Sequence, residues 1–230
     1  MIGIIDIGNT FFHCGLFKSF ELIKVKRTLS PLEVKNFFKK VKDILCISVV
    51  PSKKKLIEEV LEVELISFPS HLIQLSYSSK PGEDRLANGI GAMEVSGLPV
   101  IVVDCGSAIT IDLFSDPDDS KFLVKFEGGA ILPGLSLYFE AIYTAGALLP
   151  SISPQFVSSI GKTTEDCIKF GAYGCFVGGM KEILLRLDYK NKNLIFTGGD
   201  GNKFSSFFGA KYEPNLTLKG GVVAYNKLCS

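Results

Sequence analysis

Two short acidic turns carry residues that could handle a phosphate group. The first reads Asp-Ile-Gly-Asn-Thr at residues 6–10, and the second reads Asp-Cys-Gly-Ser-Ala at residues 104–108. Phosphoryl transfer needs a backbone that can approach phosphate oxygens, a hydroxyl or amide that bonds them, and a carboxylate that holds the metal. In the first turn the glycine permits close approach, the asparagine and threonine supply donors, and Asp6 could hold Mg²⁺ directly or through water.

The second turn repeats these parts and suggests that the chain is duplicated. Gly106 and Ser107 could mirror the phosphate contacts, which leaves Asp104 as a second carboxylate able to bind another cation. Each turn follows an apolar run and precedes a β-prone run, so the repeat predicts two related α/β lobes whose turns face each other across one cleft. Coincidence is the alternative, because Asp and Gly both suit turns.

A third candidate stands in the sequence Gly-Glu-Asp-Arg at residues 82–85. Asp84 could take a proton from a substrate hydroxyl while Arg85 binds a polar or anionic group of the substrate. The segment also lies at the junction of a loop and a helix, where a carboxylate could simply cap the helix. The residues alone leave both interpretations open.

Two other glycine motifs do not fit known nucleotide-binding loops. The run Gly-Lys-Thr at residues 161–163 resembles the end of a Walker motif, but Phe156 occupies the position of the first glycine and no strand signal precedes it. The pair Gly89 and Gly91 lacks the third glycine of the dinucleotide fingerprint, because Glu94 stands there. Nicotinamide chemistry is therefore disfavoured.

The composition is that of a soluble globular protein. The chain has 230 residues, 47% of them hydrophobic and 21% charged, with a formal net charge of +1. This balance creates no field that would attract nucleic acid, and the lysine run at residues 53–55 is predicted to be a solvated helix face. No apolar stretch reaches the length of a membrane span, and the first residues lack the pattern of a signal peptide.

The cysteines and histidines do not indicate a metal centre. The six cysteines form no Cys-x-x-Cys pair and have no metal-ligand spacing with the two histidines, so a zinc site is not predicted. His13 and His71 are predicted to be structural. Cys46 and Cys175 lie in apolar segments, where a reduced thiol acts as a small hydrophobe, which suits a cytoplasmic location.

Hydrophobic periodicity predicts the elements that carry the turns. Strands are expected at residues 1–7, 11–17, 44–50, 65–68, 100–104 and 194–197. Helices are expected at residues 31–41, 56–61, 84–95 and 164–187, and after residue 134. The boundary between the lobes is placed near Gly97-Leu-Pro99, which gives an N-terminal lobe of residues 1–98 and a C-terminal lobe of residues 99–230.

Six motifs, taken in order, resemble those of type III pantothenate kinases. They are Asp6-x-Gly-Asn-Thr10, Gly82-x-Asp-Arg85, Asp104-x-Gly-Ser-Ala108 with Thr110, Gly128-Gly-x-Ile-x-Pro-Gly134, Gly161-Lys-x-Thr164 and Thr197-Gly-Gly199. The match spans nearly the whole chain. Any one motif is weak, but six in this order make chance similarity a poor explanation.

The resemblance implies an α/β fold of the duplicated ribonuclease-H-like, actin-like ATPase class, with two similar lobes around a nucleotide cleft. It implies that the protein uses ATP to phosphorylate the 4′-hydroxyl of pantothenate, the first step of coenzyme A biosynthesis. The implied cofactors are ATP, Mg²⁺ and a monovalent cation, K⁺ or NH₄⁺. The implied assembly is a cytoplasmic homodimer with the substrate site near the interface, and neither nucleic acid nor a membrane is an expected partner.

The resemblance also implies roles for single residues. Asp84 would be the proton acceptor, Asp104 would hold the monovalent cation, and Thr164 would reach the substrate across the dimer. The implied ATP contacts are Asp6, Ile7, Gly8, Asn9, Thr10, Phe11, Phe12, His13 and Ser107. The implied pantothenate contacts are Tyr77, Gly82, Glu83, Asp84, Arg85 and Thr164.

The chain departs from the family pattern at several places. Ser107 replaces the usual threonine but keeps the hydroxyl that could bond phosphate. Glu83 replaces what is commonly a small residue. The loop between Tyr77 and Asp84 is shorter than in the family, and so is the region of residues 17–30.

Two other functions stay open. The first is that of another phosphotransferase on this fold, such as a sugar kinase, because phosphate-binding turns do not identify the molecule that accepts the phosphoryl group. A non-catalytic regulatory protein that has kept the fold is the other. The motif at residues 82–85 argues against the first, and the three carboxylates of Asp6, Asp84 and Asp104 argue against the second.

Overall fold

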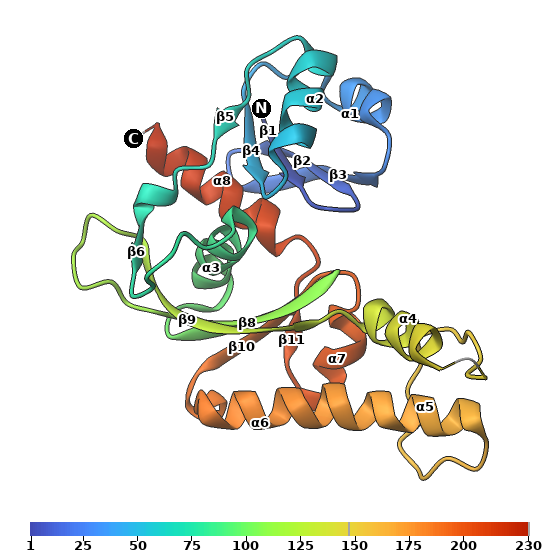
Figure 1. The fold of residues 1–230 in the computed structure, drawn as a ribbon. Coiled ribbons are helices and arrows are strands. Elements are labelled where there is room, and N and C mark those ends of the chain that lie inside the picture. The colour runs from blue at the N-terminus through green and yellow to red at the C-terminus, as the bar shows by residue number, and fades with distance from the viewer. Residues whose placement is uncertain (147, 230) are drawn as a thin grey trace. The chain divides into compact units, whose positions relative to one another are not determined.

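The computed structural model describes residues 1–146 and 148–229 (Figure 1). The chain divides into two compact units that interleave along the sequence. Unit 1 contains Met1–Val102, Asp112–Gly128 and Asn215–Ser230, and unit 2 contains Val103–Ile111 and Gly129–Pro214. These units are groups of residues that lie close together in space. The predicted boundary between residues 98 and 99 instead separates the two copies of the sequence repeat, and it stays a prediction. Among the described residues, no helix combines the length and the apolar character needed to cross a bilayer.

The first sheet lies within unit 1 and has the strand order β3-β2-β1-β4-β5. Its strands are β1 (Ile2–Ile7), β2 (Phe12–Lys18), β3 (Glu21–Thr28), β4 (Ile44–Ser48) and β5 (Ile66–Ser67). β2 pairs antiparallel with β1 and β3, whereas β4 pairs parallel with β1 and β5. The predicted hairpin at the start of the chain is confirmed. The sequence pattern did not reveal β3, an edge strand whose apolar residues alternate with exposed or half-buried charged ones.

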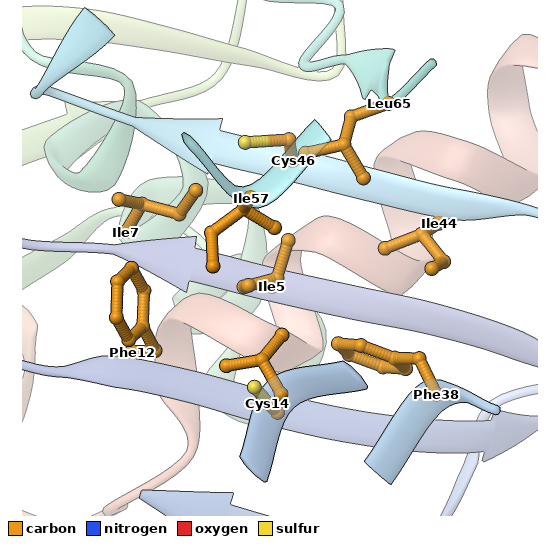
Figure 2. Packing of buried hydrophobic residues seen from close by; sticks show 10 residues of the cluster. Ile5, Ile7, Phe12, Cys14, Phe38, Ile44, Cys46, Ile57 and Leu65 are labelled. Atoms are coloured by element: carbon orange, nitrogen blue, oxygen red, sulfur yellow. The ribbon is translucent and has the colours of Figure 1, made fainter. Parts of the chain in front are cut away.

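Strand β1 is apolar on both faces because both faces of its sheet are covered. One face packs against α1 (Pro31–Phe38) and α2 (Pro51–Leu61). This core cluster contains Ile5, Ile7, Phe12, Cys14, Val34, Phe38, Ile44, Cys46, Ile57 and Leu65 (Figure 2). On the other face Ile4 and Ile47 lie beneath α8 (Leu216–Leu228), where a Cβ on Gly221 would lie 2.6 Å from Ile4 Cγ2. The apolar residues of this short run are thus all buried.

The second sheet repeats the strand order of the first. Its order is β11-β10-β7-β8-β9-β6, and without β6 this is the order β3-β2-β1-β4-β5 read from the opposite edge. The strands are β6 (Ile73–Leu75), β7 (Val100–Cys105), β8 (Ala108–Ser115), β9 (Val124–Pro133), β10 (Asn193–Thr197) and β11 (Lys211–Tyr212). The parallel pair β10–β11 corresponds to the parallel pair β4–β5. The predicted duplicated α/β fold is confirmed, with one acidic turn after β1 and the other after β7.

Two helices of unit 1, α3 (Glu83–Ser96) and α8, lie side by side at a very short distance (Figure 1). A Cβ on Gly220 would lie 1.8 Å from the carbonyl oxygen of Ala87, and a Cβ on Gly91 would lie 2.4 Å from the carbonyl oxygen of Leu216. Only glycine permits this contact of backbones. The last helix of the chain therefore fixes α3, whose first turn carries residues 83–85 of the candidate site.

The helical stretch predicted at residues 164–187 is observed in unit 2. It consists of α5 (Thr164–Tyr173), a π-helical segment (Gly174–Gly178) and α6 (Gly179–Arg186). Within the described chain a Cβ on Gly174, Gly178 or Gly179 would meet no heavy atom within 4 Å, so close helix packing at these glycines stays a prediction. Unit 2 also contains α4 (Leu135–Ala145), α7 (Gly201–Phe208) and a short 3₁₀ segment at Tyr189–Asn191, and unit 1 contains another 3₁₀ segment at Ser70–Leu72.

The prediction that a reduced thiol acts as a small hydrophobe is confirmed for Cys46. Cys14, Cys46 and Cys105 are buried, and burial raises the pKa of both Cys14 and Cys46 to about 12, so these thiols stay protonated. The same prediction is wrong for Cys175, which is exposed. An apolar neighbour in sequence does not bury a residue when the helix turns it outward.

We predict that Gly220→Ala destabilises the protein strongly. The added methyl group would overlap the backbone of α3, and overpacking of this kind costs about 1–3 kcal/mol or more. Gly178→Ala is the matched control, because its methyl group meets open space and alanine raises helix stability by up to about 1 kcal/mol. Urea unfolding of both variants checks the prediction, and a Gly220→Ala protein as stable as the parent would contradict the described contact.

Candidate active site

The first acidic turn leaves β1 at the centre of its sheet. Asp6 is in register with His13 of β2 and Ile47 of β4. The amide N–H of Gly8 donates to the carbonyl of Phe11 over 3.2 Å, which closes the turn. A Cβ on Gly8 would meet only that carbonyl, at 3.6 Å, so the packing of the described chain does not demand glycine there. A ligand that approaches the backbone closely would account for the glycine.

The residues around this turn divide into those that face the core and those that do not. Ile7 and Phe12 lie in the core cluster (Figure 2), so only their backbone could contact a nucleotide. The guanidinium carbon of Arg27 lies 4.1 Å from the centre of the Phe11 ring. Burial, with a contribution from the Arg27 charge, lowers the pKa of His13 to about 4, so this imidazole is neutral near neutral pH. That state suits the structural role predicted for His13.

The start of α3 is anchored to the strand beside the turn. The carboxylate of Glu83 accepts a hydrogen bond of 3.1 Å from the amide of Ser48, the last residue of β4. Ser48 is in turn in register with Ile7 at the end of β1. A Cβ on Gly82 would lie 3.2 Å from a methyl carbon of Val49. The motif at residues 82–85 therefore lies beside the edge of the sheet from which the first acidic turn emerges.

Asp84 has the environment expected of a proton acceptor. Its Oδ1 accepts a hydrogen bond of 2.8 Å from the amide of Arg85, and a Cβ on Gly82 would lie 2.4 Å from the same oxygen. Burial raises the pKa of Asp84 above the ordinary value of an aspartate, and the contacts with Arg85 oppose this shift only in part. Gly82, rather than Asp84, is the N-cap residue of α3. The carboxylate of Asp84 nevertheless accepts a hydrogen bond from an amide of the first helical turn, as the capping interpretation requires.

Arg85 is held by a buried carboxylate. Its Nε and one Nη bond the two oxygens of Asp112 over 3.0 and 2.5 Å, and Asp112 is only 2% exposed. The guanidinium carbon also lies 5.1 Å from the centre of the Phe126 ring. The hydrogen bonds with Asp112, and to a smaller extent the interaction with Tyr77, raise the pKa of Arg85. Tyr77 in turn packs edge-on against Phe126. We call Tyr77, Arg85, Asp112 and Phe126 the Arg85 cluster. It brings Tyr77 to the motif at residues 82–85, as the predicted pantothenate contacts require.

The second acidic turn lies in unit 2 and is packed by glycines. A Cβ on Gly198, whose φ is +80°, would lie 2.4 Å from Asp104 Oδ1. A Cβ on Gly134 would lie 2.3 and 2.7 Å from the carbonyl oxygens of Ser107 and Gly106. Gly198 thus makes room for the carboxylate of Asp104, and Gly134 makes room for two carbonyl oxygens of the same turn. Such hard oxygen donors suit an alkali or alkaline-earth cation.

Thr164 also lies in unit 2, at the exposed first position of α5. The N-cap of this helix is Thr163, whose hydroxyl accepts a hydrogen bond of 3.1 Å from the amide of Asp166. A Cβ on Gly161 would lie 2.4 Å from the amide nitrogen of Cys167, so the glycine of this motif serves the packing of the chain onto α5. The segment before it contains no strand, as the rejection of a Walker motif predicted.

Two residues of the site had no signal in the sequence. Asp112 looked like an ordinary strand residue, because its partner Arg85 stands 27 positions earlier. Lys53 was predicted to be part of a solvated helix face; it does lie on the partly exposed helix α2, but its ammonium has partners that this prediction did not include. Its Nζ bonds the carbonyl oxygens of Gly8 and Asn9 in the first acidic turn.

Comparison with known proteins identifies relatives over almost the whole chain. The family model of type III pantothenate kinases matches residues 4–186. A type III pantothenate kinase of Thermosipho melanesiensis is 30% identical, with 99% of each chain covered. Those of Kosmotoga olearia and Brevibacillus brevis are also 30% identical and cover 94% and 99% of this chain and 92% and 99% of their own.

Solved structures share the fold at lower identity. A Campylobacter jejuni protein assigned to the Baf family of transcriptional activators has a TM-score of 0.69 and 24% identity, with 99% of this chain and 98% of that chain covered. Component A of the (R)-2-hydroxyglutaryl-CoA dehydratase of Acidaminococcus fermentans has a TM-score of 0.57 and 14% identity, with both chains covered fully. These likenesses support the duplicated fold.

We predict that Asp112→Asn destabilises unit 1 by about 3–5 kcal/mol, because it leaves the buried guanidinium of Arg85 without its counter-charge. The double variant Arg85→Met with Asp112→Leu removes both charges and should recover most of that loss. Asp118→Asn, which removes an exposed partner of Lys125, is the control and should cost less than about 1 kcal/mol. Denaturant unfolding measures all three, and a harmless Asp112→Asn would refute the proposed dependence of Arg85 on its partner.

Proposed function

Because the chain belongs to the type III pantothenate kinase family, we propose that it uses ATP to phosphorylate the 4′-hydroxyl of pantothenate, the first step of coenzyme A biosynthesis. The observation that carries this proposal is the start of α3. There Asp84, a carboxylate with a raised pKa, stands beside the Arg85 cluster and beside the strand ends that form the first acidic turn. A base, a polar recognition cluster and a phosphate turn are the parts that a kinase of a small alcohol needs.

In the proposed reaction Asp84 is the general base. It accepts the proton of the 4′-hydroxyl while the hydroxyl oxygen forms a bond to the γ-phosphorus of ATP, and the bond to the β,γ-bridging oxygen breaks to release ADP. Its raised pKa makes the carboxylate a stronger proton acceptor than an exposed aspartate. Gly82, Glu83, Arg85 and Tyr77 contact pantothenate in this proposal. Asp112 fixes two donors of Arg85, so the substrate meets a guanidinium whose orientation is already set.

The first acidic turn is the proposed binding site for the ATP phosphates. Asp6 would hold Mg²⁺, directly or through water, and residues 7–13 would supply backbone and side-chain contacts, with Ile7 and Phe12 contributing only backbone. Magnesium neutralises charge on the transferring phosphoryl group when it is bound. Asp6 is half-buried near the end of β1, two residues before Gly8, and its carboxylate is a donor that suits such a hard cation. Ser107 would contact the nucleotide from the second turn.

Asp104 is the proposed ligand of a monovalent cation, K⁺ or NH₄⁺. The contact of its carboxylate with Gly198 and the carbonyl oxygens packed on Gly134 support this assignment. A cation there would offset the repulsion between phosphate charges.

We further propose a cytoplasmic homodimer in which Thr164 reaches the substrate bound to the other protomer. The exposed position of Thr164 and the exposed apolar side chains of α4 and α5 support this arrangement. Those side chains are Leu137, Tyr143 and Phe170.

Asp84→Asn should lower kcat for pantothenate by about 10²- to 10⁴-fold, because it removes the general base. The KM for ATP should change little, because the substitution leaves the phosphate turn in place. Release of ADP from MgATP, with and without pantothenate, measures both constants, and Asp118→Asn serves as a control for charge. If Asp84→Asn still turns over pantothenate at the parent rate, Asp84 is not the general base. If the parent protein shows no pantothenate-dependent turnover, pantothenate is not the acceptor.

Exchange of K⁺ for Na⁺ should lower activity by about tenfold, the effect of losing roughly 1.4 kcal/mol of transition-state stabilisation. In Asp104→Asn the activity should be low and the difference between K⁺ and Na⁺ should disappear. Steady-state assays in the two salts at constant ionic strength test this. Activity in the parent protein that is indifferent to the exchange would exclude Asp104 as a site of K⁺-dependent activation.

A further inference from the structure

Lys53 joins α2 to the first acidic turn. Its Nζ lies 2.5 Å from the carbonyl oxygen of Asn9 and 3.3 Å from that of Gly8, and 5.6 Å from the centre of the Phe12 ring. The next lysine in the run, Lys54, instead bonds the hydroxyl of Ser67 over 3.0 Å. The ammonium of Lys53 thus contacts the first acidic turn, whereas the ammonium of Lys54 contacts Ser67 of β5.

The geometry points to Lys53 as a positioning residue of the nucleotide site, which rests on the proposed function of the first turn as a phosphate site. A trans peptide directs its C=O and its N–H to opposite sides. When the ammonium holds the carbonyls of Gly8 and Asn9, the amides of Asn9 and Thr10 are directed away from Lys53. Lys53 thereby sets the direction of two amide donors that the phosphates would meet.

The charge of Lys53 adds to this effect. In the part of the chain that the structure describes, its partners are neutral carbonyls and an aromatic ring, and it takes part in none of the ion pairs found there. Its positive charge is therefore available to interact with the anionic phosphates of ATP. An ammonium that bonds a carbonyl also polarises the peptide, which makes the opposite N–H a better donor.

The test compares Lys53→Met with Lys54→Met, a change of the same charge in the next residue of the same helix. Calorimetry with MgADP should show about tenfold weaker binding for Lys53→Met, because two amide donors lose their fixed direction and a positive charge is removed, and less than about twofold change for Lys54→Met. The KM for ATP should rise in parallel while the KM for pantothenate stays within about twofold. Higher salt should narrow the difference between Lys53→Met and the parent, because part of the effect is electrostatic.

A second pair of variants keeps the test decisive if Lys53→Met is poorly folded. Lys53→Arg keeps the charge and should bind MgADP within about threefold of the parent, whereas Lys53→Gln keeps an amide donor without charge and should bind about as weakly as Lys53→Met. Parent-like affinity in both Lys53→Met and Lys53→Gln would overturn the proposal. MgADP binding does not depend on the acceptor, so a protein that binds it through Lys53 but does not phosphorylate pantothenate would refute the proposed substrate and leave this inference standing.

Discussion

The close approach of α3 and α8 is the constraint on which the geometry of unit 1 depends. Glycine at positions 91 and 220 lets the two backbones touch, and Gly221 lets the same helix α8 lie on Ile4 and Ile47 of the central strands. The helix α8 thus packs against both α3 and the first sheet. The start of α3 is then bonded to the end of β4 through Glu83. The position of Asp84 relative to the first acidic turn follows from these contacts.

The buried pair of Arg85 and Asp112 is hard to explain by stability alone. Both charges lose hydration on burial, and an apolar pair of similar size often gives a protein that is equally stable. The pair makes sense when the orientation of the guanidinium is needed, because Asp112 fixes its plane while Tyr77 and Phe126 occupy its neighbourhood. In the proposed function this donor group of fixed orientation, beside Asp84, would recognise the polar alcohol.

Features that depend on neighbours in sequence were predictable, and features that depend on distant residues were not. The apolar strands, the acidic turns and the start of α3 each follow from a few consecutive residues, and the repeat of the turns predicted the duplicated sheets. Lys53 resembled Lys54 and Lys55 because nothing local reveals that its ammonium reaches carbonyls 44 and 45 positions away. Asp112 was missed for the same reason, and β3 was missed because an edge strand needs little apolar surface.

The two acidic turns share a backbone plan but differ in what surrounds them. In each turn the amide of the glycine donates to a carbonyl oxygen near the start of the following strand. The acceptor in the first turn is Phe11, three residues after Gly8. In the second turn it is Ala108, two residues after Gly106. In the first turn the ammonium of Lys53 bonds backbone carbonyl oxygens, whereas in the second turn the carboxylate of Asp104 packs against Gly198. A lysine at a carbonyl favours the binding of anions by the opposite amides, and a carboxylate near carbonyl oxygens favours a cation. Lys53 approaches the first turn from outside the repeat, so a comparison of the two turn sequences could not reveal this difference between their surroundings.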